Sequence, residues 1–205
     1  MYDAALFLHL LGVVLLAGSI AVTLLATLRV QTAETVRELR SLIAGTKRVE
    51  AVIVPAMLFI IGPGLYMVSQ HGYHGRIPWN AGWVVTSLVI TLLLTVMGPT
   101  VEASDDRRLR AAIASATSER PEADLREIQL AARPSYVVFF GTSQVVALLY
   151  LMTNRPGLAV AIGACAVAAL ASVIAASLRI RSVRRVTPVP AMPSSGGETR
   201  RAAGK

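Results

Sequence analysis

The stretch AALFLHLLGVVLLAGSIAVTLLATL, residues Ala4–Leu28, decides the fold of this chain. It contains no Asp, Glu, Lys or Arg, and as a helix it would span about 38 Å, enough to cross a hydrocarbon core of about 30 Å. Four further apolar stretches follow, at 49–68, 77–97, 135–153 and 157–178. Because lipid offers no partner to an open backbone group, each stretch should be helical. The sequence therefore predicts an all-α polytopic membrane bundle of five transmembrane helices.

The positive charges alternate between the gaps that separate these stretches. Of the 20 Lys and Arg, 18 lie in Arg29–Arg48, in Gly98–Pro134 and in the tail from Arg179. The other two gaps carry one each, Arg76 and Arg155. Because cytoplasmic loops retain Lys and Arg, the split predicts an N-terminus outside and a C-terminus in the cytoplasm.

The same distribution explains the formal net charge of +8. Basic residues beside the spans suit the anionic inner leaflet of a lipid bilayer, and no nucleic-acid-binding motif accompanies them. We therefore expect a lipid partner and no nucleic acid. Residues 1–180 are expected to form one bundle and 181–205 a basic, disordered cytoplasmic tail. Thr32–Ile43 has one apolar face, which predicts an amphipathic cytoplasmic extension or surface helix, and a second short helix is expected after Ser118.

The first span places its polar side chains on one helical stripe. At about 100° per residue, a sector less than a quarter-turn wide contains His9, Gly12, Leu16, Ser19, Thr23 and Thr27. Polar groups in lipid turn inward, so this stripe should face the bundle. His9 is either a histidine hydrogen-bonded to a neighbouring helix or a haem or metal ligand.

Other spans add interior polar groups and two prolines. Ser87 and Thr91, one turn apart in the third span, should bond between helices or to carbonyls of their own helix. Gln144 in the fourth span should bond between helices or contact a substrate. Pro55 and Pro63 lie within the second span, and each removes a backbone hydrogen bond. They predict a helix break or bend, which in transporters lines a binding site.

All three histidines fall on the predicted outer side. His71 and His74 lie in the short loop Ser69–Arg76, and Met67 is at the same level. Imidazole and thioether groups suit copper or haem iron, so these residues form a candidate metal site; the alternative is neutral loop histidines. No Ser-His-Asp set, phosphate-binding loop or zinc-ligand spacing occurs in the sequence.

Three short motifs carry a family resemblance: Leu8-His9-Leu10-Leu11-Gly12 with Ala17-Gly18, Pro55-Ala56-Met57 with Gly64-Leu65, and Leu151-Met152-Thr153-Asn154-Arg155-Pro156. In this order they resemble a group of small bacterial membrane proteins. The group includes a predicted integral-membrane family of unknown function, its relatives with a copper-resistance D-type domain, and the membrane-type protoporphyrinogen oxidase. The resemblance covers the first four spans and implies the bacterial cytoplasmic (inner) membrane.

The oxidase relatives imply a haem site. Their span-one histidine, thought to hold haem, matches His9, and Arg155-Pro156 stands where they carry Lys-Pro. This chain departs from them at Leu16, where they usually have tryptophan, and it lacks their Asn-Glu-Val-Pro element around Ala131–Tyr136. These departures favour the uncharacterised branch.

Three functions follow as hypotheses. The first is a non-enzymatic bundle that binds a ligand or a partner, either a second copy or another membrane protein. The second is a haem-binding oxidoreductase that uses His9 and Arg155. The third is a small-solute or copper transporter, which the proline break and the outer His and Met residues would serve.

Overall fold

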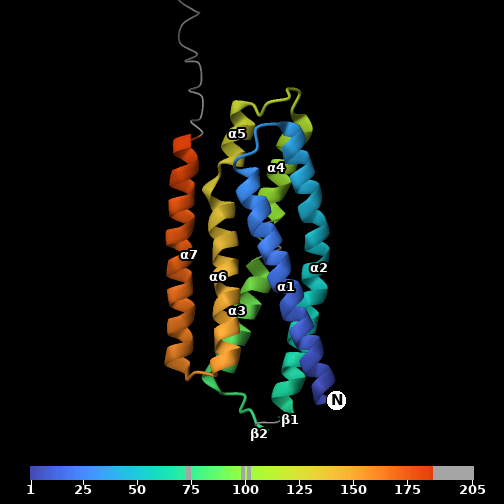
Figure 1. Ribbon diagram of the computed structural model, residues 1–205, viewed down its shortest axis with the longest axis vertical. Helices are drawn as coiled ribbons and strands as arrows, with labels where there is room; N and C mark the ends of the chain where they lie inside the picture. Colours follow the sequence, from blue (N-terminus) through green and yellow to red (C-terminus); the bar gives the residue numbers. More distant parts are fainter. Residues whose placement is uncertain (73–74, 98–99, 101–102, 187–205) are drawn as a thin grey trace, which may run out of the picture.

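The structure, a computed structural model, describes residues 1–72, 75–97, 100 and 103–186. Its helices are α1 (Tyr2–Val30), α2 (Val36–Ser69), α3 (Gly82–Met97), α4 (Ala103–Ser115), α5 (Ala123–Gln129), α6 (Ala132–Asn154) and α7 (Leu158–Val186). Two short antiparallel strands, β1 (His71–Gly72) and β2 (Gly75–Arg76), form a small hairpin. The long helices run side by side along one axis (Figure 1). The predicted all-α fold class is confirmed, with the hairpin as an addition.

Several helices have the length and composition of membrane spans. Four helical runs in the described part of the chain are long and apolar enough to cross a membrane: Tyr2–Val30, Val36–Ser69, Ala123–Asn154 and Leu158–Val183. Helix α3 is apolar but has 16 residues, about 24 Å at 1.5 Å per residue, which is less than a hydrocarbon core of about 30 Å. The expectation of five spans therefore stays a prediction.

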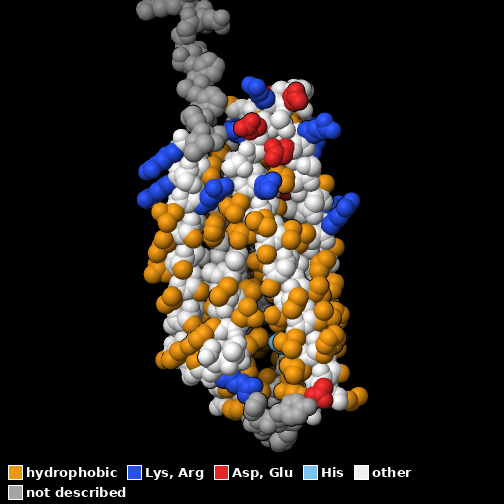
Figure 2. Space-filling model, in the orientation of Figure 1, with side chains coloured by type: hydrophobic (Ala, Val, Ile, Leu, Met, Phe, Trp, Pro, Cys, Tyr) orange, Lys and Arg blue, Asp and Glu red, His pale blue; other side chains and the backbone are white. Residues whose placement is uncertain are grey.

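The two ends of the bundle differ in character. The α1–α2 turn, α4 and α5 form one end, where Figure 2 shows acidic and basic side chains gathered; we call it the charged end. Strands β1 and β2 and the N-terminus lie at the other, the hairpin end (Figure 1). Hydrophobic side chains cover much of the flank between them (Figure 2).

Helices α1 and α2 approach closely at a glycine. A Cβ added to Gly12 would lie 2.8 Å from the Ala56 carbonyl oxygen and 2.9 Å from the Ile60 nitrogen. Leu16, Ala56, Ile60 and Val145 form a buried cluster beside this contact. The buried residues of α1 are Ala5, His9, Gly12, Leu16 and Ser19, at spacings of three and four, so the stripe expected to face the bundle does so.

Helix α2 differs from its predicted form at its start. It begins at Val36 rather than 49, because the amphipathic segment continues into the span without interruption. The helix runs through Pro55 and Pro63 without a break, and a bend at these prolines stays a prediction. Each proline removes one backbone hydrogen bond. The other backbone groups of the helix stay paired with one another, because lipid offers them no alternative partner.

The third and fifth predicted spans also change bounds. Helix α3 begins at Gly82, which abuts the backbone of Leu158 at the start of α7, and not at Ile77. Helix α7 continues to Val186, so residues 181–186 extend the helix instead of starting the tail. The remainder of the predicted disordered tail, 187–205, lies outside the described residues.

We predict that Gly12→Ala destabilises the protein by about 1–3 kcal/mol, the usual cost of overpacking a tight contact. Gly18→Ala is the matched control on the same helix, because no atom lies within 4 Å of its added Cβ. Unfolding midpoints of the variants in mild detergent check this. A loss of stability in both variants, or in neither, would contradict the close contact of α1 with α2 at Gly12.

Candidate functional site

A cavity lies at the charged end. It is a cavity of about 230 Å³ among the ends of α1, α2, α4 and α6 and the link from α5 to α6. Its polar and charged lining residues are Thr23, Thr27, Gln31, Thr46, Asp105, Asp106, Arg108 and Gln129. Its apolar lining residues are Ala26, Val30, Ile43, Leu109, Ile128, Ala131, Pro134, Val137 and Val138. The cavity is therefore lined by polar and apolar side chains together.

One side of this end is held by an apolar cluster. Ala33, Val36, Leu39, Ile43, Ile113 and Leu125 are buried together, which packs the first turns of α2 against α4 and α5. The amphipathic face predicted for Thr32–Ile43 supplies Val36, Leu39 and Ile43 to this cluster, so it packs on protein. The Thr35 hydroxyl accepts from the Glu38 N–H and caps the start of α2.

The backbone carbonyls of the α1–α2 turn are bonded by distant side chains. The Gln129 amide donates to the carbonyls of Val30 at 2.5 Å and Ala33 at 2.9 Å. Arg126 also donates to Ala33, at 2.7 Å. Carbonyls at a helix end have no partner within the helix. Donors from α5 therefore fix the turn and, with it, one wall of the cavity.

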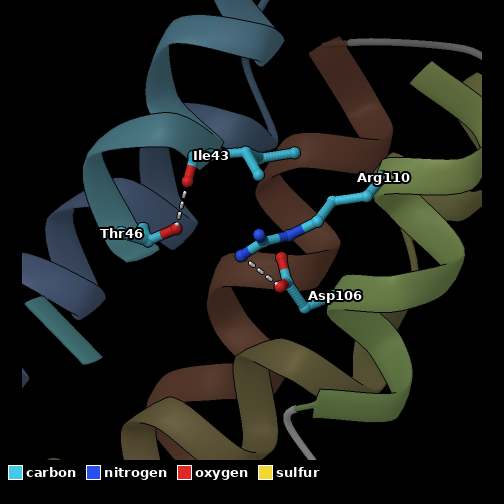
Figure 3. Close-up of polar contacts among 4 residues, drawn as sticks. All are labelled: Ile43, Thr46, Asp106 and Arg110. Carbon is cyan, nitrogen blue, oxygen red and sulfur yellow. Dashed lines mark hydrogen bonds and ion pairs between the residues drawn. The ribbon is translucent and has the colours of Figure 1, made fainter. Parts of the chain in front are cut away.

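Two ion pairs lie at the α4 wall. Arg110 contacts Asp106 at 2.5 Å, and Figure 3 shows this pair pointing from α4 toward Ile43 and Thr46 of α2. Arg133, which precedes Pro134 of the lining, contacts Asp105 at a longer 3.4 Å. The carboxylates of Asp105 and Asp106 thus belong to the cavity wall.

The threonines and Gln31 use their donors elsewhere. Thr23, Thr27 and Thr46 donate to the carbonyls of Ser19, Thr23 and Ile43, at 2.9–3.0 Å. The Gln31 amide donates to the Ser135 hydroxyl, and the Gln31 carbonyl oxygen is buried with no hydrogen-bond partner. Apart from the Arg108 guanidinium, the polar lining residues therefore offer acceptors.

His9 bonds to a neighbouring helix. Its Nδ1 lies 2.9 Å from the Ile60 carbonyl oxygen, and a Cβ on Gly64 would lie 3.2 Å from the same nitrogen. Since a carbonyl can only accept, Nδ1 carries the proton, and Nε2 of a neutral ring is left as an acceptor. This tautomer suits either a structural histidine or an iron ligand.

A small cavity lies between α1, α2, α3 and α6, and His9 is not among its lining residues. This cavity has about 30 Å³, room for one or two water molecules. Helix α2 fills the space beside Gly12.

Arg155 does not join His9. It ends α6 in a left-handed conformation with φ of 49°, and its guanidinium lies 5.9 Å from the centre of the Trp83 ring on α3. This is a cation–π contact with a helix other than the partner of His9. Among the described contacts, none joins the two residues of the predicted haem site.

Only part of the predicted metal site belongs to the described residues. His71 is in β1, Met67 is half-buried near the end of α2, and His74 lies outside the described residues. Among the described residues no group of three or more His, Cys, Asp or Glu lies together. His71, His74 and Met67 therefore stay a prediction.

The interior polar residues lie in two places. Ser19, Ser87, Thr91 and Gln144 are buried, and the Gln144 amide donates to the Cys165 carbonyl at 3.1 Å, which joins α6 to α7. The Gln144 carbonyl oxygen and the Ser87 hydroxyl have no hydrogen-bond partner. Thr23 lies apart from them, on the wall of the 230 Å³ cavity.

Sequence reasoning missed the residues that build the cavity. Gln31, Asp105, Asp106 and Gln129 lie in gaps between the spans and read there as ordinary loop residues. The signal that could have found them is weak: an amide at the end of an apolar helix, and an acidic pair in a basic loop. Their convergence depends on contacts between residues about a hundred positions apart.

The fold and its lining define a class of protein, an integral membrane helix bundle with a cavity at its charged end. The chain belongs to the family described as predicted integral membrane protein (DUF2269), whose family model matches residues 4–156. The predicted membership of an uncharacterised membrane family is confirmed. No curated protein and no solved structure matches the chain.

We predict that Gln129→Leu destabilises the protein by about 1–3 kcal/mol, the cost of a buried polar group without its partner. The Val30 carbonyl would keep only the 3.4 Å bond from the Ala33 N–H. Gln70→Leu is the control, because that side chain is exposed at the other end of the bundle. Unfolding in detergent should separate the two variants; equal midpoints would show that the Gln129 bonds do not hold the turn.

Proposed function

We propose that this protein is a five-span protein of the bacterial cytoplasmic membrane that binds a small ligand, without catalysing a reaction, in the cavity at its charged end. The cavity is the observation on which this proposal rests. Its volume of about 230 Å³ exceeds the roughly 150 Å³ of an engineered cavity that holds benzene, so a small organic molecule has room.

The lining supports binding rather than catalysis. The described lining residues contain no Ser, Cys, His, Lys or Tyr, and the two carboxylates, Asp105 and Asp106, are in ion pairs with arginines. The threonine protons are committed to backbone carbonyls. Such a wall can recognise a ligand by hydrogen bonds and charge, and it has no activated nucleophile.

The charged end is proposed to face the cytoplasm. The basic residues of the α1–α2 turn, of α4 and α5 and of the end of α7 all belong to this end, as the positive-inside rule requires. Helix α3 would be the short fifth span, with Trp79 and Trp83 at its outer end. The ligand would then enter from the cytoplasm or from the inner leaflet.

The alternative functions have less support. A haem oxidoreductase would need His9 and Arg155 at one site, and these side chains contact different helices. A transporter would gain from a broken helix, and α2 is continuous. Binding of a second copy or of a membrane partner remains compatible with ligand binding in the cavity.

We predict that a cysteine at Ser69, near the hairpin end, reacts with a membrane-impermeant maleimide in intact cells from which the outer membrane has been removed. A cysteine at Ser118, exposed at the charged end, should react only after lysis. Cys165, which is buried, is replaced by alanine in both variants. The reverse labelling pattern would overturn the proposed orientation.

We also predict that filling the cavity abolishes ligand binding. The purified protein in a neutral maltoside detergent is titrated with 2-phenylethylamine, 2-phenylethanol and 3-phenylpropionate, and its unfolding midpoint is measured. At 100 times its Kd a ligand stabilises the folded state by about 2.7 kcal/mol. At least one compound should stabilise the wild type and not Ala26→Phe, in which a ring occupies the cavity.

The matched control for that experiment is Ala21→Phe, on the exposed face of the same helix. It should respond as the wild type does. If none of the three compounds stabilises the wild type, or if Ala26→Phe responds equally, the cavity is not a ligand site and the proposed function fails.

A further inference from the structure

The hydrogen-bonding groups of the cavity wall are nearly all acceptors. The protons of Thr23, Thr27 and Thr46 are used on helix carbonyls, which leaves lone pairs on the three hydroxyl oxygens. The Gln129 amide donates to the turn and the Gln31 amide to Ser135. A ligand that itself brings only acceptors would therefore find few donors on this wall.

One acceptor in the lining has no donor at all. Gln31 is 4% exposed, and its carbonyl oxygen is buried without a partner. An unpaired buried polar group costs about 1–3 kcal/mol. A ligand that donates to this oxygen would recover that cost on binding.

The better-buried charges of the wall are negative. The Asp105 side chain is 19% exposed, against 56% for its partner Arg133, and Asp106 is 27% exposed against 33% for Arg110. Arg108 is exposed at the rim. Solvent screens the exposed guanidinium groups of Arg133 and Arg108 more strongly than the Asp105 carboxylate, so a positive group in the cavity is favoured beside Asp105.

The apolar lining residues set the rest of the ligand. Val30, Ile43, Leu109, Ile128 and Val138 lie among the polar residues of the lining and offer nothing to a second charged group. A ligand that suits this lining has one donor-rich cation and a short hydrocarbon body.

We infer that the cavity binds a small amine whose primary ammonium meets Gln31 and Asp105 and whose apolar body lies against the apolar lining residues. This inference rests on the proposed function, because it names the ligand class of the same cavity. An ammonium supplies three donors and a positive charge, which matches a wall of acceptors. The ammonium belongs either to a soluble amine or to an ethanolamine phospholipid of the inner leaflet.

Comparison of the three compounds tests the ligand class. 2-Phenylethylamine should bind the full-length protein at least about tenfold more tightly than 2-phenylethanol, since a charged hydrogen bond contributes about 1.5–3 kcal/mol. 3-Phenylpropionate should bind least. If the alcohol or the carboxylate binds as tightly as the amine and is lost in Ala26→Phe, the amine inference is wrong while cavity binding stands. If no compound binds, the proposed function itself fails.

Two variants test whether Asp105 and Gln31 contact the ammonium group. Asp105→Asn should weaken amine binding about tenfold and leave alcohol binding unchanged, and Gln31→Glu should tighten amine binding. Asp124→Asn, at an exposed position of α5 outside the lining, is the matched control and should change neither. Equal effects of Asp105→Asn on the amine and the alcohol would show a structural role and overturn the charge contact.

Nanodiscs distinguish the two sources of ammonium. In phosphatidylcholine, whose trimethylated ammonium donates no hydrogen bond, 2-phenylethylamine should bind as it does in detergent. If phosphatidylethanolamine lowers its apparent affinity in the wild type, the lipid headgroup competes for the cavity and is the source. An unchanged affinity assigns the site to a soluble amine.

Discussion

The charged end depends on the backbone carbonyl groups of the α1–α2 turn that have no donor within their own helix. A helix end leaves backbone acceptors without intrahelical donors, and here Leu28, Val30 and Ala33 receive bonds from side chains of α5 and α7. Gln129 of α5 and Arg179 of α7 both donate to carbonyls at the end of α1. The turn therefore connects α1 with two helices that come much later in the chain. The cavity lies beside this junction and is bounded by it.

The two ends of the bundle are built by different forces. Toward the hairpin end, α1 and α2 touch backbone to backbone at Gly12 and Ala56, and His9 adds a hydrogen bond to Ile60. Small residues permit this approach, which is how helices associate in lipid without a hydrophobic driving force. At the charged end, side-chain hydrogen bonds and an ion pair connect the helices, and the cavity of about 230 Å³ lies among them.

His9 connects α1 to α2 toward the hairpin end. Pro63 takes the amide donor away from the α2 carbonyl one turn earlier, that of Phe59, and His9 donates to the next carbonyl, that of Ile60. This bond orients α1 on α2 beside the proline. The candidate ligand site lies at the opposite end of the bundle.

The sequence by itself determined the membrane class, the helical state and the inward stripe of α1, because the cost of exposing polar groups to lipid acts on every residue of a span. It also showed, through the resemblance of residues such as His9 and Gly12, the family to which the chain belongs. Tertiary structure alone decided that α2 is continuous and that Gln31, Gln129 and Asp105 surround one cavity. These residues converge through contacts about a hundred positions apart, and such contacts leave no periodic pattern in a single sequence.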